Sequence, residues 1–131
     1  MRFRFLEHTA DIKFRAYGKT LNEVFENAGL AFFEVCCNTK KVKPLIKKEL
    51  SIKSEDLKSL LYDFLEELLY LHEAEHYLFS KFKVIIKGLK LTATLWGEKI
   101  NQSHELRSMI KAVTYNDMIV EKGMAQVVLD L

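Results

Sequence analysis

The sequence has little proline and glycine: one proline and five glycines occur in 131 residues. Disordered and low-complexity chains are rich in these residues, so their scarcity argues against a largely disordered protein. The apolar fraction of 49% is that of a folded domain. A chain of this length buries enough surface to fold without disulfides or metals. We therefore expect one compact domain spanning residues 1–131.

Long apolar runs and an excess of one charge are also missing. No run of 18 apolar residues is present, so no membrane-spanning segment is expected. The N-terminal MRFRFLEHT lacks the long apolar core of a signal peptide. The 20 basic and 18 acidic residues leave a net charge of only +2, which by itself does not indicate a nucleic-acid-binding protein. These absences favour a cytoplasmic protein.

The two cysteines, Cys36 and Cys37, are adjacent. Neighbouring cysteines rarely meet disulfide geometry without strain, and the sequence offers no third thiol as a partner. We expect two buried or half-buried thiols in a reducing cytoplasm.

Hydrophobic periodicity predicts an α+β fold. Alternating apolar residues indicate strands at 2–5, 12–17 and 50–52, a hairpin of 82–86 and 91–95 that reverses at GLK, and two long strands within 105–131 joined at 122–123. Helical spacing indicates one helix from Leu21, with Thr20 and Glu23 as a capping box, and a second helix that Ser54 opens. The expected architecture is a single domain with two helices packed on one face of a mostly antiparallel β-sheet.

The segment HEAEH, residues 72–76, matches the H-E-x-x-H pattern of zinc proteases. A catalytic zinc needs a third protein ligand, and the following YLFSKFKV carries no further histidine. The match also lies where the helical pattern ends. We therefore interpret His72 and His76 as polar residues of a helix end, where histidines interact favourably with the helix dipole.

The segment NTKKVKPLIKKE is rich in lysine and could contact a phosphate backbone. Because no aromatic residues are interleaved with its lysines, we favour a solvated connector over residues 40–48.

The C-terminal stretch VVLDL places Asp130 beside the α-carboxylate of Leu131. Two adjacent carboxylates repel each other and favour a cation. If Asp11, which precedes the strand 12–17, lay close to them, three hard oxygen donors would converge, a set that suits calcium or magnesium and not zinc. The alternative is that Asp11 is an ordinary turn residue.

Several motifs together resemble the archease family over nearly the whole chain. They are HTADIKFRAYG followed by the capped helix from Leu21, the acidic and leucine-rich LLYDFLEELL, KAVTYND, and the terminal VVLDL. The family commonly has a histidine after the tyrosine of KAVTY. This chain has Asn116 there, so Asn116 is given no chemical role.

The resemblance implies an accessory protein and not an enzyme. Archeases assist the GTP-dependent tRNA-splicing ligase, which joins RNA ends bearing a 3′-phosphate or cyclic phosphate to a 5′-hydroxyl. They promote guanylylation of the ligase and its multiple turnover. The family's divalent-cation site maps onto Asp11, Asp130 and Leu131, with calcium as the expected ion and magnesium or manganese as alternatives. Lys111 matches a family lysine tied to activation, although from the residues alone it is a surface strand lysine.

The expected partner is thus this ligase, with RNA contact indirect or weak and no membrane. Two other functions stay open. One is a general chaperone or modulator of RNA-modifying enzymes. The other is a stand-alone metal-dependent phosphoester enzyme, which would need a general base, and His8 and His104 are the candidates that the sequence offers.

Overall fold

The computed structural model describes residues 1–7 and 10–131 of the chain. Over this part, two α-helices and one short 3₁₀ helix pack with eight strands. In chain order the elements are β1 (Phe3–Leu6), β2 (Ile12–Tyr17), α1 (Leu21–Cys36), η1 (Thr39–Lys41), β3 (Ile46–Lys53), α2 (Leu57–Glu73), β4 (Tyr77–Lys87), β5 (Lys90–Lys99), β6 (Ala112–Val113), β7 (Ile119–Glu121) and β8 (Met124–Asp130).

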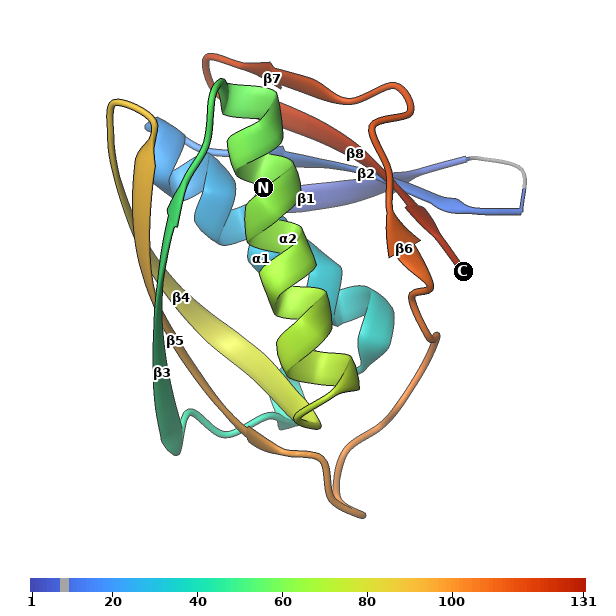
Figure 1. Cartoon of the computed structure of the whole chain (residues 1–131). Helices are drawn as coiled ribbons and strands as arrows, with labels where there is room; N and C mark the ends of the chain where they lie inside the picture. Colours follow the sequence, from blue (N-terminus) through green and yellow to red (C-terminus); the bar gives the residue numbers. More distant parts are fainter. Residues whose placement is uncertain (8–9) are drawn as a thin grey trace.

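The strands form two antiparallel sheets, and both helices contact strands of each (Figure 1). The first sheet has the order β1-β2-β8-β6, with β7 also paired to β8, and the second has the order β3-β5-β4. This confirms the predicted α+β class with two helices packed on antiparallel strands. The sequence predicts one sheet, and the structure divides the strands between two. Alternation with a period of two assigns a residue to a face of a strand, but it does not identify the neighbouring strand.

Both helices begin at side-chain caps. Thr20 Oγ1 accepts a hydrogen bond from the amide of Glu23 at 3.2 Å, as predicted for α1. The predicted start of α2 at Ser54 is wrong: the helix is capped by Asp56, whose Oδ1 accepts from the Ser59 amide at 2.7 Å. Asp56 and Ser59 cap each other reciprocally, and this fixes the helix start two residues after Ser54. The hydroxyl of Ser54 instead donates to Asp63 at 2.6 Å.

The segment before β6 departs from the sequence prediction. A long strand was expected there, but β6 and β7 contain only two and three residues. The main chain of residues 105–108 instead binds the end of α1: the amides of Arg107 and Ser108 donate to the carbonyls of Cys36 and Val35 at 2.8 and 3.1 Å. Carbonyls in the last turn of a helix lack partners within the helix, and this loop supplies them. The predicted hairpin at 122–123 is confirmed between β7 and β8.

Side chains of α1 cover one edge of the second sheet. Glu26 Oε2 accepts from the amide of Val84 at 2.8 Å, and Asn22 Oδ1 accepts from the amide of Ile86 at 2.9 Å. β4 pairs with β5 on its other side, so these bonds satisfy donors that an edge strand would otherwise expose. The inner face of this sheet contributes Val84, Leu91 and Leu95 to the core, so its opposite face remains for solvent.

Cys36 and Cys37 are buried free thiols, as predicted. Burial raises the pKa of Cys36 far above its ordinary value and that of Cys37 to about 12. Both thiols therefore stay protonated and unreactive at neutral pH. Among the described residues, no helix is long and apolar enough to cross a lipid bilayer.

Candidate functional site

The C-terminal end of β8 lies between β2 and β6 (Figure 1). The last pair of the β2–β8 ladder is Ile12 with Leu129, and Asp130 pairs with Ala112 of β6. One further step along the β2–β8 register sets Asp11 opposite Asp130, and the main-chain bond from Lys111 to the Asp130 carbonyl sets Lys111 beside Asp130 as well. The fold therefore brings together all four residues that the sequence singled out, although they span positions 11 to 131.

Main-chain bonds fix Lys111 to this strand end. Its amide donates to the carbonyl of Asp130 at 2.8 Å. Three residues later, Thr114 donates to the carbonyl of Val128 from both its hydroxyl, at 2.8 Å, and its amide, at 3.3 Å. The Lys111 side chain is exposed, and its ammonium takes part in none of the ion pairs found among the described residues. The site thus presents the positively charged side chain of Lys111 on a main chain that hydrogen bonds hold in place.

A stacked pair of tyrosines ties the same segment to α2. The rings of Tyr62 and Tyr115 have centroids 4.2 Å apart and planes within 6° of each other. A hydrogen bond to the Glu66 carboxylate raises the pKa of Tyr62, and burial followed by the nearby Asp63 charge raises the pKa of Tyr115. Both phenols therefore remain neutral at physiological pH. The stack joins LLYDFLEELL to KAVTYND, two of the motifs on which the family resemblance rests.

The face of β8 that carries Asp130 is covered over part of its length. Gln126 on this face accepts from Arg15 Nε at 2.9 Å and donates to the carbonyl of Asp117 at 2.8 Å. Lys13 of β2 forms an ion pair with Asp117 at 3.2 Å. This network holds the turn before β7 over the middle of β8. Asp130, beyond it, is half-buried, and by strand alternation it shares its face with Asp11, which is also half-buried.

The donors at this strand end fit a hard divalent cation. Asp11 and Asp130 offer carboxylate oxygens, which are ligands that calcium and magnesium prefer. Within residues 1–7 and 10–131, no three side chains of His, Cys, Asp or Glu are grouped so that they could hold a metal ion. A cation here would therefore combine two aspartates with main-chain, solvent or partner oxygens.

The HEAEH segment does not form the zinc-protease arrangement. Helix α2 ends at Glu73, and His76 lies beyond it with a φ of 61°, so the two histidines do not share a helical face. His72 Nδ1 is hydrogen-bonded to the carbonyl of Tyr77 at 3.0 Å, and its ring packs edge-on against Phe33. The prediction of a polar helix end is confirmed for His72, whereas His76 lies beyond the last residue of the helix.

His104 is a structural residue. Its Nδ1 accepts from the Asn101 amide at 3.0 Å, so Nε2 carries the proton and donates to Glu98 at 2.8 Å. The hydrogen bond from His104, followed by one from the Lys43 amide, lowers the pKa of Glu98. With both ring nitrogens engaged, His104 is not placed to act as a general base. His8, the other candidate base, lies outside the described residues.

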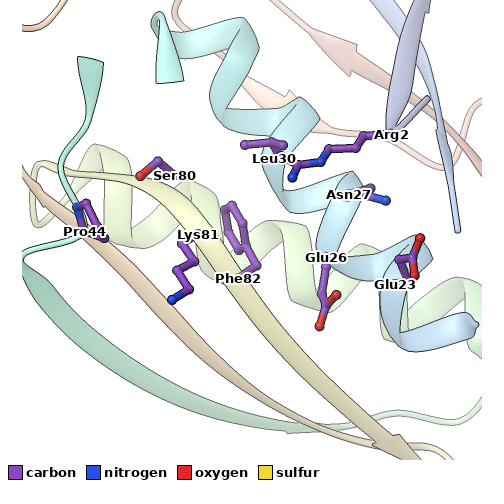
Figure 2. A pocket seen from close by; sticks show the side chains of 9 residues that line it. All are labelled: Arg2, Glu23, Glu26, Asn27, Leu30, Pro44, Ser80, Lys81 and Phe82. Atoms are coloured by element: carbon purple, nitrogen blue, oxygen red, sulfur yellow. The ribbon is translucent and has the colours of Figure 1, made fainter. Parts of the chain in front are cut away.

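A cavity of about 620 Å³ opens between α1 and β4, away from these residues (Figure 2). Figure 2 shows Glu23, Glu26 and Asn27 projecting from α1 and Phe82 standing on β4. Asn27 already donates to the carbonyl of Tyr17 at 2.6 Å, and Glu26 binds the edge of β4. These polar groups serve the fold, and the cavity holds no converging set of acids, bases or nucleophiles.

Sequence reasoning missed Thr114 and the tyrosine stack as positioning elements. Thr114 falls within the strands predicted over 105–131, and nothing local distinguishes a threonine that binds the neighbouring strand from one that faces solvent. The stack pairs residues 53 positions apart, so only the tertiary fold shows it.

The chain matches known proteins along its whole length. The model of the Archease protein family (MTH1598/TM1083) matches residues 3–131. A protein named Protein archease from Methanothermobacter thermautotrophicus is 50% identical, with 98% of each chain covered. A relative of the same name from Pyrococcus abyssi is 45% identical, with 99% of each chain covered.

Two solved structures are similar. The solution structure of protein 1598 from Methanobacterium thermoautotrophicum has a TM-score of 0.86 and 48% identity, and covers 99% of both chains. The crystal structure of an archease from Thermotoga maritima, described as a possible chaperone, has a TM-score of 0.64 at 20% identity, with 96% of this chain and 94% of that chain covered. The second match shows the fold alone.

Proposed function

Because this chain belongs to the archease family, we propose that it is an accessory protein that activates a GTP-dependent RNA ligase acting on 3′-phosphate and 5′-hydroxyl ends. In this proposal it promotes guanylylation of the ligase and so its repeated turnover, and it has no ligation activity alone. Family membership supports the coarser accessory role in RNA processing, and the ligase is the specific partner that we infer.

One observation carries the proposal: the four residues to which the family resemblance gives a role meet at one strand end. Asp11 and Asp130 lie one step beyond paired positions of β2 and β8, and Lys111 donates its amide to Asp130. Three of these residues are charged, and none of the four is fully buried. Their grouping therefore does not serve the hydrophobic core.

The chemistry of these groups suits a nucleotide-handling partner. Guanylylation moves a nucleotidyl phosphate, so negative charge must be stabilised as it develops. The exposed Lys111 ammonium can approach a phosphate oxygen of a partner. A divalent cation bound by Asp11, Asp130 and Leu131 would supply further positive charge. The hydrogen bonds of Thr114 hold the main chain still while the lysine acts.

Exposed apolar side chains precede and follow Lys111 in the chain, and we infer that they form part of a docking surface for the ligase. Met109 is 78% exposed, Leu106 is 55% exposed and Tyr115 is 52% exposed. They lie in the segment on both sides of Lys111. Leu106 and Met109 line the same hollow, and a partner protein that covered them would remove apolar surface from water. We infer that the ligase covers this segment when Lys111 acts.

A ligation time course with limiting cognate ligase tests the proposal. RNA ends bearing a 3′-phosphate and a 5′-hydroxyl are supplied in excess with GTP and metal. We expect several turnovers per ligase with this protein, about one without it, and no product from this protein alone. Equal turnover with and without it, at several ratios, would refute ligase activation. Product without ligase would favour a stand-alone enzyme.

Calorimetric titration with calcium and magnesium tests the cation site separately. Asp11→Ala and Asp130→Ala should each weaken binding, because each removes one oxygen ligand. Extending the chain beyond Leu131 converts its carboxylate to an amide and should weaken binding as well, whereas an N-terminal extension should not. Unchanged affinity in all three variants would remove the cation from the proposal and leave Lys111 as its active group.

A further inference from the structure

The outer face of the second sheet gathers lysines from all three of its strands. Alternation places residues 47, 49, 51 and 53 of β3, residues 90, 92, 94 and 96 of β5, and residues 81, 83, 85 and 87 of β4 on this face. We call it the lysine face. Its lysines are all exposed, and they are Lys47, Lys53, Lys81, Lys83, Lys87 and Lys90.

The strand registers arrange these residues in rows. One end row is Lys53, Lys90 and Lys87, and the other is Lys47, Trp96 and Lys81. The connector predicted over residues 40–48 is thus wrong for its last part, because 46–48 belong to β3 and Lys47 joins this face. Neighbouring strands are about 4.8 Å apart, so lysines of one row lie within reach of the same or adjacent phosphates of a nucleic-acid strand.

The charge on the lysine face is far from balanced. It carries six lysines and the acid Glu49, and Glu98, the next residue of the same parity on β5, lowers its net charge to +4, while the whole chain is +2. The rest of the molecule is therefore net −2. Among the described residues, only Lys47 of this set forms an ion pair, with Glu49 at 3.9 Å. The nearly neutral composition conceals a strongly basic surface, the electrostatic pattern of a nucleic-acid-binding protein.

Hydroxyls and one indole ring complete the face. A hollow of about 450 Å³ lies between the two end rows, and the hydroxyl groups of Ser51, Thr92 and Thr94 are in its lining. The other lining residues are Glu49, Leu50 and Ala93. Trp96, the single tryptophan of the chain, lies under Lys81, whose Nζ is 4.8 Å from the ring centroid. Phosphate contacts in nucleic-acid complexes come from such lysine and hydroxyl groups.

We propose that the lysine face binds the sugar-phosphate backbone of a single RNA strand. Charge complementarity selects a polyanion, and the row spacing with interposed hydroxyls and an aromatic ring suits a repeating phosphate chain better than scattered carboxylates. The face spans about 20 Å along β4, long enough for several nucleotides. The proposal revises the sequence expectation of indirect or weak RNA contact, and it is independent of ligase activation.

The test measures binding of a labelled oligouridylate of about twelve nucleotides at about 50 mM salt, with no ligase present. Fluorescence anisotropy follows the RNA, and the fluorescence of Trp96 reports from the face itself. We expect the triple variant Lys53→Gln, Lys87→Gln and Lys90→Gln to bind at least about ten-fold more weakly, and its salt-dependence slope to fall by about 2.

Two further variants make the result decisive. The matched control changes three exposed lysines outside the face, which are Lys19, Lys40 and Lys122, to glutamine, with the same loss of net charge. The second face variant, Lys81→Gln with Lys83→Gln, removes charge from the opposite end. Loss in both face variants with retention in the control would support the proposal.

Three results would overturn it. The first is no RNA binding by the unchanged protein at low salt. The second is an equal effect of the control and the face variants, which would indicate net charge alone. The third is poly-glutamate binding as tight as RNA and equally sensitive to the face variants, which would indicate an acidic protein partner. Because no ligase is present, these results do not bear on ligase activation.

Discussion

Replacing Tyr62 and Tyr115 by leucine, singly and together, tests whether their stack holds the segment that carries Lys111. The rings are 4.2 Å apart and nearly parallel. An aromatic pair contributes about 0.5 to 1.5 kcal/mol beyond its buried area. Because Tyr115 is 52% exposed, we expect the lower half of this range, a coupling of about 0.5 to 1 kcal/mol in the unfolding free energy.

Urea unfolding of the unchanged protein, both single variants and the double variant gives this coupling as a double-mutant cycle. The single variants should also lower ligase activation, because the stack positions Lys111. The control is Ser80→Ala, which removes the hydrogen bond of Ser80 Oγ to the Val42 carbonyl at 2.9 Å and should cost about 1 kcal/mol without affecting activation. Additive effects of the two tyrosines, or equal loss of activation in the control, would refute the reasoning.

Three further predictions concern other parts of the fold. Gly97→Ala should lower stability by about 3 kcal/mol or more in thermal unfolding, because the added Cβ would lie 1.8 Å from a main-chain carbonyl oxygen at the β4–β5 bulge; a stable variant would contradict this. Glu98→Gln should cost about 1 to 2 kcal/mol at pH 7. Since the hydrogen bond from His104 lowers the folded pKa of Glu98, its contribution is present above the unfolded pKa of about 4.3 and is lost as pH falls through the folded value, so the two proteins should converge in stability once Glu98 is protonated in the folded state. A difference that persists in acid, where the carboxyl group is protonated, would assign the effect to packing. Changing His72 and His76 to glutamine should alter neither metal content nor activation, and loss of a stoichiometric zinc would restore the zinc-site hypothesis.

Local periodicity was sufficient for most of the elements. The strand 12–17 and the helix from Leu21 occur where the sequence predicts them, because alternation and caps are local properties. The strand predicted before residue 122 failed for a nonlocal reason: its main chain is used to complete the end of α1. The predicted start of α2 is wrong because the sequence offers two possible caps, Ser54 and Asp56. Asp56 caps the helix because its bond with Ser59 is reciprocal and therefore stronger.

The candidate site shows the limit of sequence reasoning more clearly. Asp130 and Leu131 are adjacent in the chain, but their proximity to Asp11 and Lys111 depends on the order of β2, β8 and β6, which a hydrophobic pattern does not specify. The family resemblance supplied those residues, and the registers supply a physical reason for their grouping. No such resemblance pointed to the lysine face, because its residues alternate with core residues on three strands and their charge is cancelled in the total.

The most direct test of the account compares Lys111→Ala with Lys122→Ala in a ligation time course under limiting ligase. Both lysines are exposed, and both changes should alter unfolding free energy by no more than about 0.5 kcal/mol. The account predicts that Lys111→Ala lowers multiple turnover by about ten-fold or more, while Lys122→Ala leaves it unchanged. Undiminished activation by a folded Lys111→Ala protein would contradict the claim that the end of β8 is the activating site.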